Sequence, residues 1–181
     1  AKDGFDRTDP ALLKMLLLAY RDKSTAQTPL QGLLTLTPVV PVSVSYELDP
    51  CAVDKAHELA VIEQLGEYIK KPDEDLKSMV QGLMGHKGRV RLAFGEPITA
   101  ASSLEDLTEQ LDQTIVANTR LYPTHRYARA LNAGLDTQDV VNHPTVRVLA
   151  AELESLSAAE RPFLLQQYAN IWRNRQELGI G

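Results

Sequence analysis

The sequence predicts an α/β fold in which helices cover a sheet of few strands and a helical C-terminal region follows. Two segments, residues 39–46 and 89–94, alternate apolar side chains with small or basic ones, which is the period of a strand. Helix-start signals flank these segments, and after Ile98 only helical patterns continue. We therefore expect residues 1–100 to form the α/β part, with a mixed sheet, and residues 101–181 to form a helical appendage.

Composition excludes several classes of protein. The chain has 181 residues, of which 44% are hydrophobic and 24% charged, and its formal net charge is -5. A chain of this length buries roughly 70% of its unfolded surface and needs no disulfide or structural metal. The lone Cys51 fits a reducing compartment, which predicts the cytoplasm. The acidic balance argues against a nucleic-acid-binding protein, and no apolar run reaches the ~18 residues of a membrane-spanning helix.

Asp-Pro pairs predict the first two helix starts, because Asp caps free N–H groups and Pro suits the first helical turn. The pair at residues 9–10 starts a helix predicted over residues 10–22, and the pair at residues 49–50 starts one over residues 51–69. A third helix is predicted over residues 73–84, with acidic residues in its first turn. The second helix carries one apolar stripe: Leu59, Ile62, Leu65 and Ile69.

The two predicted strands each have two different faces. Residues 39–46 are interpreted as a buried strand. One of its faces carries Val40, Val42, Val44 and Tyr46, and the other carries Val39, Pro41, Ser43 and Ser45. The second face is small, as beside a cavity or a closely packed helix. Residues 89–94 set an apolar face, predicted to join the core, against a face with two arginines.

The C-terminal region reads as helices throughout. Ser-x-x-Glu capping boxes predict helices over residues 102–120 and 157–177. Between them, a short helix is predicted after Pro123, and another from about residue 137 that is kinked near Pro144.

The familiar catalytic signatures are absent from the sequence, including the Gly-x-Ser-x-Gly elbow and His-Glu-x-x-His. The glycine-rich segment 82–88 precedes a strand, so it is interpreted as a helix end and turn rather than a phosphate loop. The four histidines have no partner at metal-ligand spacing, so we predict no metal site. Cys51 is interpreted as a packed residue, although the nearby helix start could lower its pKa.

The polar segment before the first helix, residues 2–8, is the best candidate binding site in the chain. Lys2 and Arg7 place two cations beside Gly4 and a helix start, an arrangement that suits a phosphate. A frayed, solvated terminus is the alternative. Two other basic groups could meet an anionic headgroup, although solvated faces also explain them: Arg89 with Arg91, and Arg120 with His125, Arg126 and Arg129.

Three segments resemble, in order and spacing, the later half of bacterial glycerolipid acyltransferases, in the lysophosphatidate and glycerol-3-phosphate acyltransferase superfamily. They are Ala-Lys-Asp-Gly-Phe-Asp-Arg-Thr-Asp at residues 1–9, Val-Val-Pro-Val-Ser-Val-Ser-Tyr-Glu at residues 39–47, and Arg-Val-Arg-Leu-Ala-Phe-Gly-Glu-Pro-Ile at residues 89–98. The similarity covers about residues 1–100 and extends the fold expectation: this part resembles the later half of that family's α/β domain.

Two family motifs carry the resemblance. Residues 1–4 are similar to the end of the third motif, Glu-Gly followed by small and basic residues, which helps to bind the acceptor's phosphate. Residues 40–42 are similar to the fourth motif, of Val-Pro-Val type, which lines the site. The Glu-Gly that would precede residue 1 lies outside this sequence, so we expect the chain to begin in mid-domain.

The resemblance implies part of an acyltransferase of phospholipid synthesis. Such an enzyme moves a fatty acyl group from acyl-CoA or acyl carrier protein to a glycerol-phosphate or lysophosphatidate acceptor, without a cofactor and in peripheral contact with the cytoplasmic membrane. By this resemblance Lys2 and Arg7 hold the acceptor phosphate, and Pro41 and Ser43 form the pocket wall. In the family a His-x-x-x-x-Asp motif supplies the base. No His in this sequence has Asp five positions later, so no residue is assigned as catalytic and the chain alone is expected to be inactive.

Two other classes of function stay open. A non-catalytic module derived from the same fold could bind a protein or a membrane through the C-terminal helix, beside Arg173 and Arg175. That helix carries these apolar residues: Phe163, Leu164, Tyr168, Ile171 and Trp172. An unrelated binder of a small phosphate metabolite is the third class. A chain that begins in mid-domain would also leave apolar faces uncovered, which predicts self-association.

Overall fold

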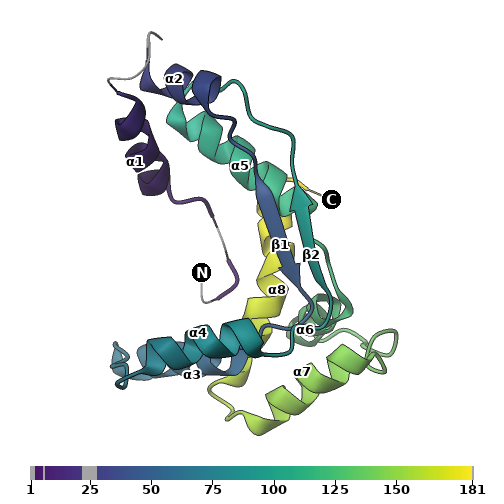
Figure 1. The fold of residues 1–181 in the computed structure, drawn as a ribbon. Coiled ribbons are helices and arrows are strands. Elements are labelled where there is room, and N and C mark those ends of the chain that lie inside the picture. Colours follow the sequence, from purple (N-terminus) through teal and green to yellow (C-terminus); the bar gives the residue numbers. More distant parts are fainter. Residues whose placement is uncertain (1–2, 6, 22–27, 181) are drawn as a thin grey trace.

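The computed structural model describes residues 3–5, 7–21 and 28–180. In these residues eight helices and two strands follow one another along the chain (Figure 1). The elements are α1 (Pro10–Tyr20), α2 (Pro29–Leu36), β1 (Val42–Tyr46), α3 (Ala52–Leu65), α4 (Glu74–Met84), β2 (Val90–Phe94), α5 (Leu104–Asn118), α6 (Pro123–Ala133), α7 (Pro144–Ser155) and α8 (Arg161–Glu177).

The sheet is smaller than the sequence predicts. β1 and β2 pair antiparallel, with Val44 opposite Leu92, and a single bridge between Val39 and Ile98 continues the pairing. The α/β class is confirmed in this coarse form, a mostly helical chain with one small sheet. The expected mixed sheet is wrong for the described residues, where both strands belong to one antiparallel pair.

Helices cover one face of this sheet, and it is the serine face. In Figure 1 the two strands lie in front of α5, α6 and α8. Ser43 and Ser45 are 1% and 3% exposed, because their hydroxyls have partners in the segment that joins α5 to α6. Ser43 Oγ lies 3.0 Å from Thr119 Oγ1, and Ser45 Oγ accepts a hydrogen bond from the Arg120 backbone N–H. The prediction of a small face beside a cavity or a helix is confirmed.

The opposite, apolar face of the sheet is exposed, which corrects two predictions. The valine face of β1 was expected to be buried, and the apolar face of β2 was expected to join the core. Instead, their side chains are 37–71% exposed. No described helix packs on this face, because α5, α6 and α8 lie on the other side. The six residues are Val42, Val44, Tyr46, Val90, Leu92 and Phe94.

Two groups of buried residues form the core. The larger one joins α3, α6, α7 and α8 and includes the fully buried Leu149 and Leu164. The smaller one joins α1, α2 and α5 around Leu107. Because α3 packs on α8 and β1 on α5, elements from before and after residue 100 share these interfaces.

Most helix predictions are confirmed, with shifted ends. α1 starts where the Asp-Pro pair predicts, since Asp9 accepts a hydrogen bond from the Ala11 N–H. The predicted capping box at residue 102 lies one residue later, with Ser103 as the cap of α5. α7 begins at Pro144 rather than being kinked there, and α8 begins after the Ser157 turn. Part of the connection after α1 lies outside the described residues.

Two helix predictions are wrong. α2 was missed, although Thr28 caps it by accepting from the Gln31 N–H and Pro29 opens it. The second predicted helix buries a different stripe from the expected one. Ile62 and Leu65 are exposed, whereas the small residues Ala52, Ala56 and Ala60 pack closely against the rest of the fold. Among the described residues, no helix has both the length and the apolar character to span a membrane.

Candidate functional site

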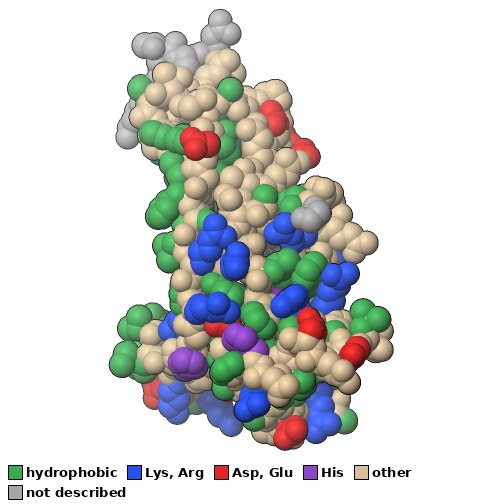
Figure 2. Space-filling view, turned by 90° about the vertical axis from the view of Figure 1, so that its right-hand side faces the viewer, with side chains coloured by type: hydrophobic (Ala, Val, Ile, Leu, Met, Phe, Trp, Pro, Cys, Tyr) green, Lys and Arg blue, Asp and Glu red, His purple; other side chains and the backbone are tan. Residues whose placement is uncertain are grey.

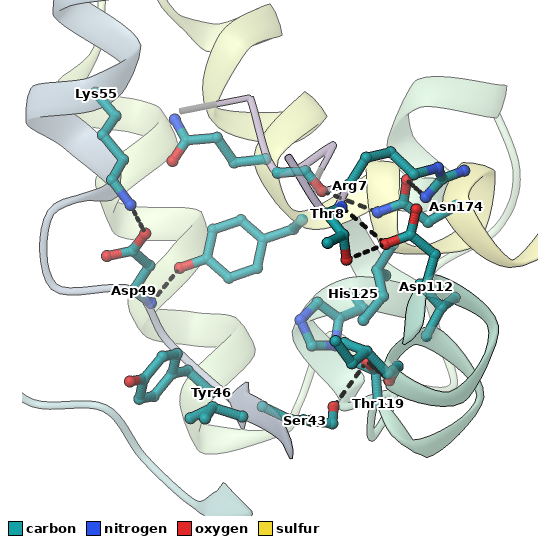
Figure 3. Close-up of a pocket in the computed structure, with 18 residues that line it drawn as sticks. Arg7, Thr8, Ser43, Tyr46, Asp49, Lys55, Asp112, Thr119, His125 and Asn174 are labelled. Carbon is teal, nitrogen blue, oxygen red and sulfur yellow. Dashed lines mark hydrogen bonds and ion pairs between the residues drawn. The ribbon is translucent and has the colours of Figure 1, made fainter. Parts of the chain in front are cut away.

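A cavity of about 420 Å³ opens between the N-terminal segment, β1, α5 and α8. Its wall includes two of the predicted site residues, Arg7 and Ser43, together with polar groups from α3, α6 and α8. Figure 3 places Arg7 and Asn174 on one side of the cavity and Lys55 and Asp49 on the other. Two of the four predicted site residues thus line one cavity, whose other lining residues were not predicted.

Arg7 lies at the edge of the cavity and is attached to α8. Its Nη1 atom donates to Asn174 Oδ1 at 2.9 Å, and its Nη2 atom lies 3.4 Å from Glu177 Oε2. The guanidinium also stacks on Phe5, 4.6 Å from the ring centroid. These contacts hold the guanidinium in one orientation. Because the side chain is 27% exposed, a ligand can still reach it.

The other predicted site residues differ in position. Ser43 lines the cavity through the buried face of β1. Pro41, predicted for the pocket wall, does not line this cavity. Pro41 is fully buried just before β1, where its carbonyl accepts from the Gly95 N–H at 2.8 Å. Lys2 lies outside the described residues.

The opposite side of the cavity carries charges that sequence reasoning missed. Lys55 Nζ lies 2.5 Å from Asp49 Oδ2, with both side chains about one-third exposed. The Asp49 backbone N–H donates to the Tyr168 hydroxyl at 2.9 Å. Burial raises the pKa of that hydroxyl, so Tyr168 keeps its proton and can donate it. The Asp-Pro signal marked this turn as a helix start but gave no sign of the contact with α8.

His125 forms a buried, neutral part of the wall. Its Nδ1 atom accepts a hydrogen bond from the Tyr122 backbone N–H at 2.9 Å, so the ring proton sits on Nε2. Burial lowers the pKa of the imidazole to about 4. No described residue accepts a hydrogen bond from Nε2, which leaves a neutral donor in the cavity wall. His125 is therefore separated from the exposed arginines with which the sequence grouped it.

The charges in the cavity nearly cancel. Asp112 accepts from both the N–H and the hydroxyl of Thr8, at 2.8 and 2.6 Å, and Asp49 pairs with Lys55. Gln167 donates to the Ala52 carbonyl, but its buried Oε1 atom has no partner among the described residues. The cavity thus has a cation on each side, Arg7 and Lys55, and unpaired neutral polar groups on His125 and Gln167. This arrangement suits a ligand with one charged end and further polar atoms.

The segment that carries Arg7 is fastened to α8 by its backbone. The Asp3 and Gly4 carbonyls accept from the side-chain amides of Asn170 and Asn174, at 2.7 and 3.3 Å. Gly4 has φ +73°, and a Cβ there would lie 2.2 Å from the Gln167 carbonyl oxygen. Only glycine fits this approach.

We expect Gly4→Ala to lower the free energy of unfolding by about 2 kcal/mol and to loosen this segment, because strain and a backbone clash add together. Urea unfolding and amide hydrogen exchange of residues 5–8 measure the two effects. Gly134→Ala is the matched control, since Gly134 has φ +63° with no atom near its missing Cβ. Equal losses in the two variants would contradict the close approach at Gly4.

The remaining sequence candidates have structural roles. Burial and the nearby Asp49 carboxylate raise the pKa of the Cys51 thiol, so the helix start does not make it a thiolate. Segment 82–88 is a helix end and turn, as predicted, and Lys87 donates to the carbonyls of Leu83 and Gly85. Among the described residues no group of His, Cys, Asp and Glu is placed to hold a metal ion.

The basic face of β2 contributes an ion pair to the fold. Arg89 donates to the buried Glu47 carboxylate through Nε and Nη2, at 3.1 and 2.8 Å, and through its backbone N–H at 3.0 Å. These hydrogen bonds keep the Arg89 side chain on Glu47, whereas Arg91 and Arg120 are exposed. Figure 2 shows the side of the molecule on which Lys and Arg side chains gather.

Comparison with known proteins finds no matching family model, no matching curated protein and no matching solved structure.

Proposed function

We propose that this chain is the acceptor-binding part of an acyltransferase, which moves a fatty acyl group from acyl-CoA or acyl carrier protein to a glycerol-phosphate or lysophosphatidate acceptor. The observation that carries the proposal is the cavity beside Arg7 and Ser43, two residues that the family resemblance assigns to the acceptor site. They lie 36 positions apart in the sequence and line one cavity.

The polar groups of the cavity suit such an acceptor. The Arg7 guanidinium offers a planar set of donors to a phosphate, which replaces the weak 3.4 Å contact with Glu177. His125 Nε2–H and the Tyr168 hydroxyl can donate to the ester carbonyl or to a glycerol hydroxyl. In the proposed complex Arg7 fixes the phosphate, and this orients the acceptor hydroxyl for attack on the acyl thioester.

His125 does not supply the missing base in this proposal. A general base works best with a pKa near the working pH, and burial holds the pKa of His125 at about 4. Its Nδ1 atom also faces a backbone N–H instead of an orienting carboxylate. The proposed activity therefore needs a base from outside this chain, so the direct test is binding rather than acyl transfer.

A short-chain lysophosphatidate, titrated by calorimetry, tests the proposal. We expect saturable binding that weakens roughly tenfold in Arg7→Gln, the loss of one charge-assisted contact. Arg21→Gln, which removes an exposed arginine at the end of α1, is the matched control and should bind as wild type does. Monoacylglycerol of the same chain length, which lacks the phosphate, should bind more weakly than lysophosphatidate to the wild type.

Three results would overturn the assignment. They are equal affinity for monoacylglycerol, equal affinity of the Arg7 and Arg21 variants, or a loss confined to Lys55→Gln, which would put the anion on the other side of the cavity. Urea unfolding of each variant separates a lost contact from a lost fold. Saturable binding of inorganic phosphate, unaffected by an acyl chain, would instead favour a binder of small phosphate metabolites.

The alternative of a module that binds through the C-terminal helix loses its main support. Leu164 and Tyr168 are 0% and 4% exposed and belong to the larger core, so this face of α8 is already covered. Trp172 lies under the Arg129 guanidinium, 4.3 Å from the ring centroid.

A further inference from the structure

The uncovered side of the β1–β2 sheet is an exposed apolar surface. Its six side chains, from Val42 to Tyr46 and from Val90 to Phe94, are all apolar or aromatic. The water-facing side of an antiparallel sheet normally carries polar side chains. This face carries no charged side chain, which marks it as a surface that another molecule covers.

The apolar surface continues from the sheet onto α4. This helix has no buried residue, and its apolar side chains recur at the spacing of one helical face, with 53–78% of each exposed. The five residues are Leu76, Met79, Val80, Leu83 and Met84. Figure 1 places α4 and the sheet in the same front layer, and hydrophobic side chains run down the corresponding edge in Figure 2. We call these eleven residues the apolar front.

We propose that a second copy of this chain covers the apolar front, so that the protein forms a symmetric dimer through its sheet and α4. The proposal does not rest on the proposed acyltransferase function, because the sheet face and α4 are exposed whether or not the cavity binds an acceptor. Val44 and Tyr46 are the two residues that belong both to the apolar front and to the cavity lining.

The area of the apolar front fits this occupant. Six side chains that are about half exposed leave on the order of 500 Å² on the sheet, and α4 adds about as much again. Pairing two copies would bury on the order of 2,000 Å², which exceeds the ~1,600 Å² of a standard stable interface. Two apolar sheet faces can also stack directly, at the ~10 Å spacing of packed sheets, and this buries both without unpaired polar groups.

A lipid surface fits less well. Binding to anionic bilayers is strengthened by basic residues around the apolar area. The first turn of α4 is acidic instead, with Glu74 and Asp75, and Lys70 is already paired with Asp75. Arg89 and Arg91 lie on the opposite face of β2 from its apolar residues.

Light scattering after size-exclusion chromatography tests the proposal with the full chain. At roughly micromolar concentrations we expect a dimer. Leu92→Asp, which places a charge at the centre of the sheet face, should return the protein to a monomer. Leu135→Asp is the matched control, because Leu135 is just as exposed, at 62% against 56%, but lies after α6 and outside the apolar front. Because Leu92 is exposed, its replacement leaves the core intact, which circular dichroism verifies.

A crosslink locates the interface independently. In a Cys51→Ser background, Leu92→Cys should form a disulfide-linked dimer under mild oxidation, whereas Leu135→Cys should not. A wild type that is monomeric at all concentrations, or a dimer that survives in Leu92→Asp, would overturn the proposal. Co-sedimentation of a monomer with phosphatidylglycerol vesicles, lost in Leu92→Asp, would overturn it in favour of a lipid surface.

Discussion

Glu47→Ala is expected to lower the free energy of unfolding by about 4 kcal/mol, because it removes one partner of a buried ion pair. The Glu47 carboxylate is 2% exposed and accepts three hydrogen bonds from Arg89, one of them from the backbone. Alanine removes all three and leaves the Arg89 N–H, just before β2, unpaired. It also leaves an empty space beside Gly88, where an added Cβ would lie only 2.9 Å from the Glu47 side chain.

Urea unfolding at neutral pH measures this loss. Glu96→Ala removes an exposed glutamate from the loop after β2 and should change the stability by less than about 0.5 kcal/mol. Glu47→Gln keeps the shape and one acceptor, so it should fall between the two. A Glu47→Ala variant as stable as Glu96→Ala would contradict the assigned role of the ion pair.

The Glu47–Arg89 ion pair also predicts that the free energy of unfolding falls at acid pH. Burial alone would raise the pKa of Glu47, but the hydrogen bonds and charge of Arg89 outweigh it and lower the pKa from 4.5 to about 2. A carboxylate with a lowered pKa stabilises the fold fully above pH 4.5 and loses that contribution as the pH falls toward 2. After allowing for the solvent exposure of Arg89, the loss is about 2 kcal/mol, and it should be absent in Glu47→Gln.

Local signals in the sequence predicted the elements better than their burial. The Asp-Pro and Ser-x-x-Glu signals act within a few residues, and helices lie close to where they place them. α2 was missed, although Thr28 and Pro29 form the same kind of start signal. Capping signals of this kind can be recognised from the sequence alone, because the residues that interact are neighbours in the chain.

Whether a side chain is buried depends on partners far away in the sequence, and local patterns did not predict it correctly for β1. Alternation correctly separated the serines of β1 from its valines, but the strand was predicted to be buried, whereas only the serine face is buried. The serines are buried because Thr119 and Arg120, about 75 residues later, supply their hydrogen bonds. Likewise, Arg7 and Ser43 were predicted for the site from their motifs, whereas Lys55 and Tyr168 carry no motif and line it only because α3 packs on α8.

Lowering the pH from 6.5 to 4 is expected to remove about 3 kcal/mol of stability through His125 alone. Burial holds the pKa of this imidazole at about 4, below its ordinary value of 6.5. Between these values the unfolded chain binds a proton that the folded chain excludes, so acid favours unfolding. The loss is complete near pH 4, and it occurs at higher pH than the loss through Glu47, so the two groups can be separated in one titration.

Comparison of the wild type with His125→Asn isolates this contribution. Asparagine cannot titrate in this range, and its side-chain oxygen can still accept from the Tyr122 N–H at the start of α6. Between pH 7 and 4.5 the wild type should lose more stability than His125→Asn, whereas His86→Asn, which alters an exposed histidine, should follow the wild type. Parallel stability curves for the wild type and His125→Asn, or an imidazole NMR titration centred near 6.5, would show that His125 is not held neutral in the cavity wall.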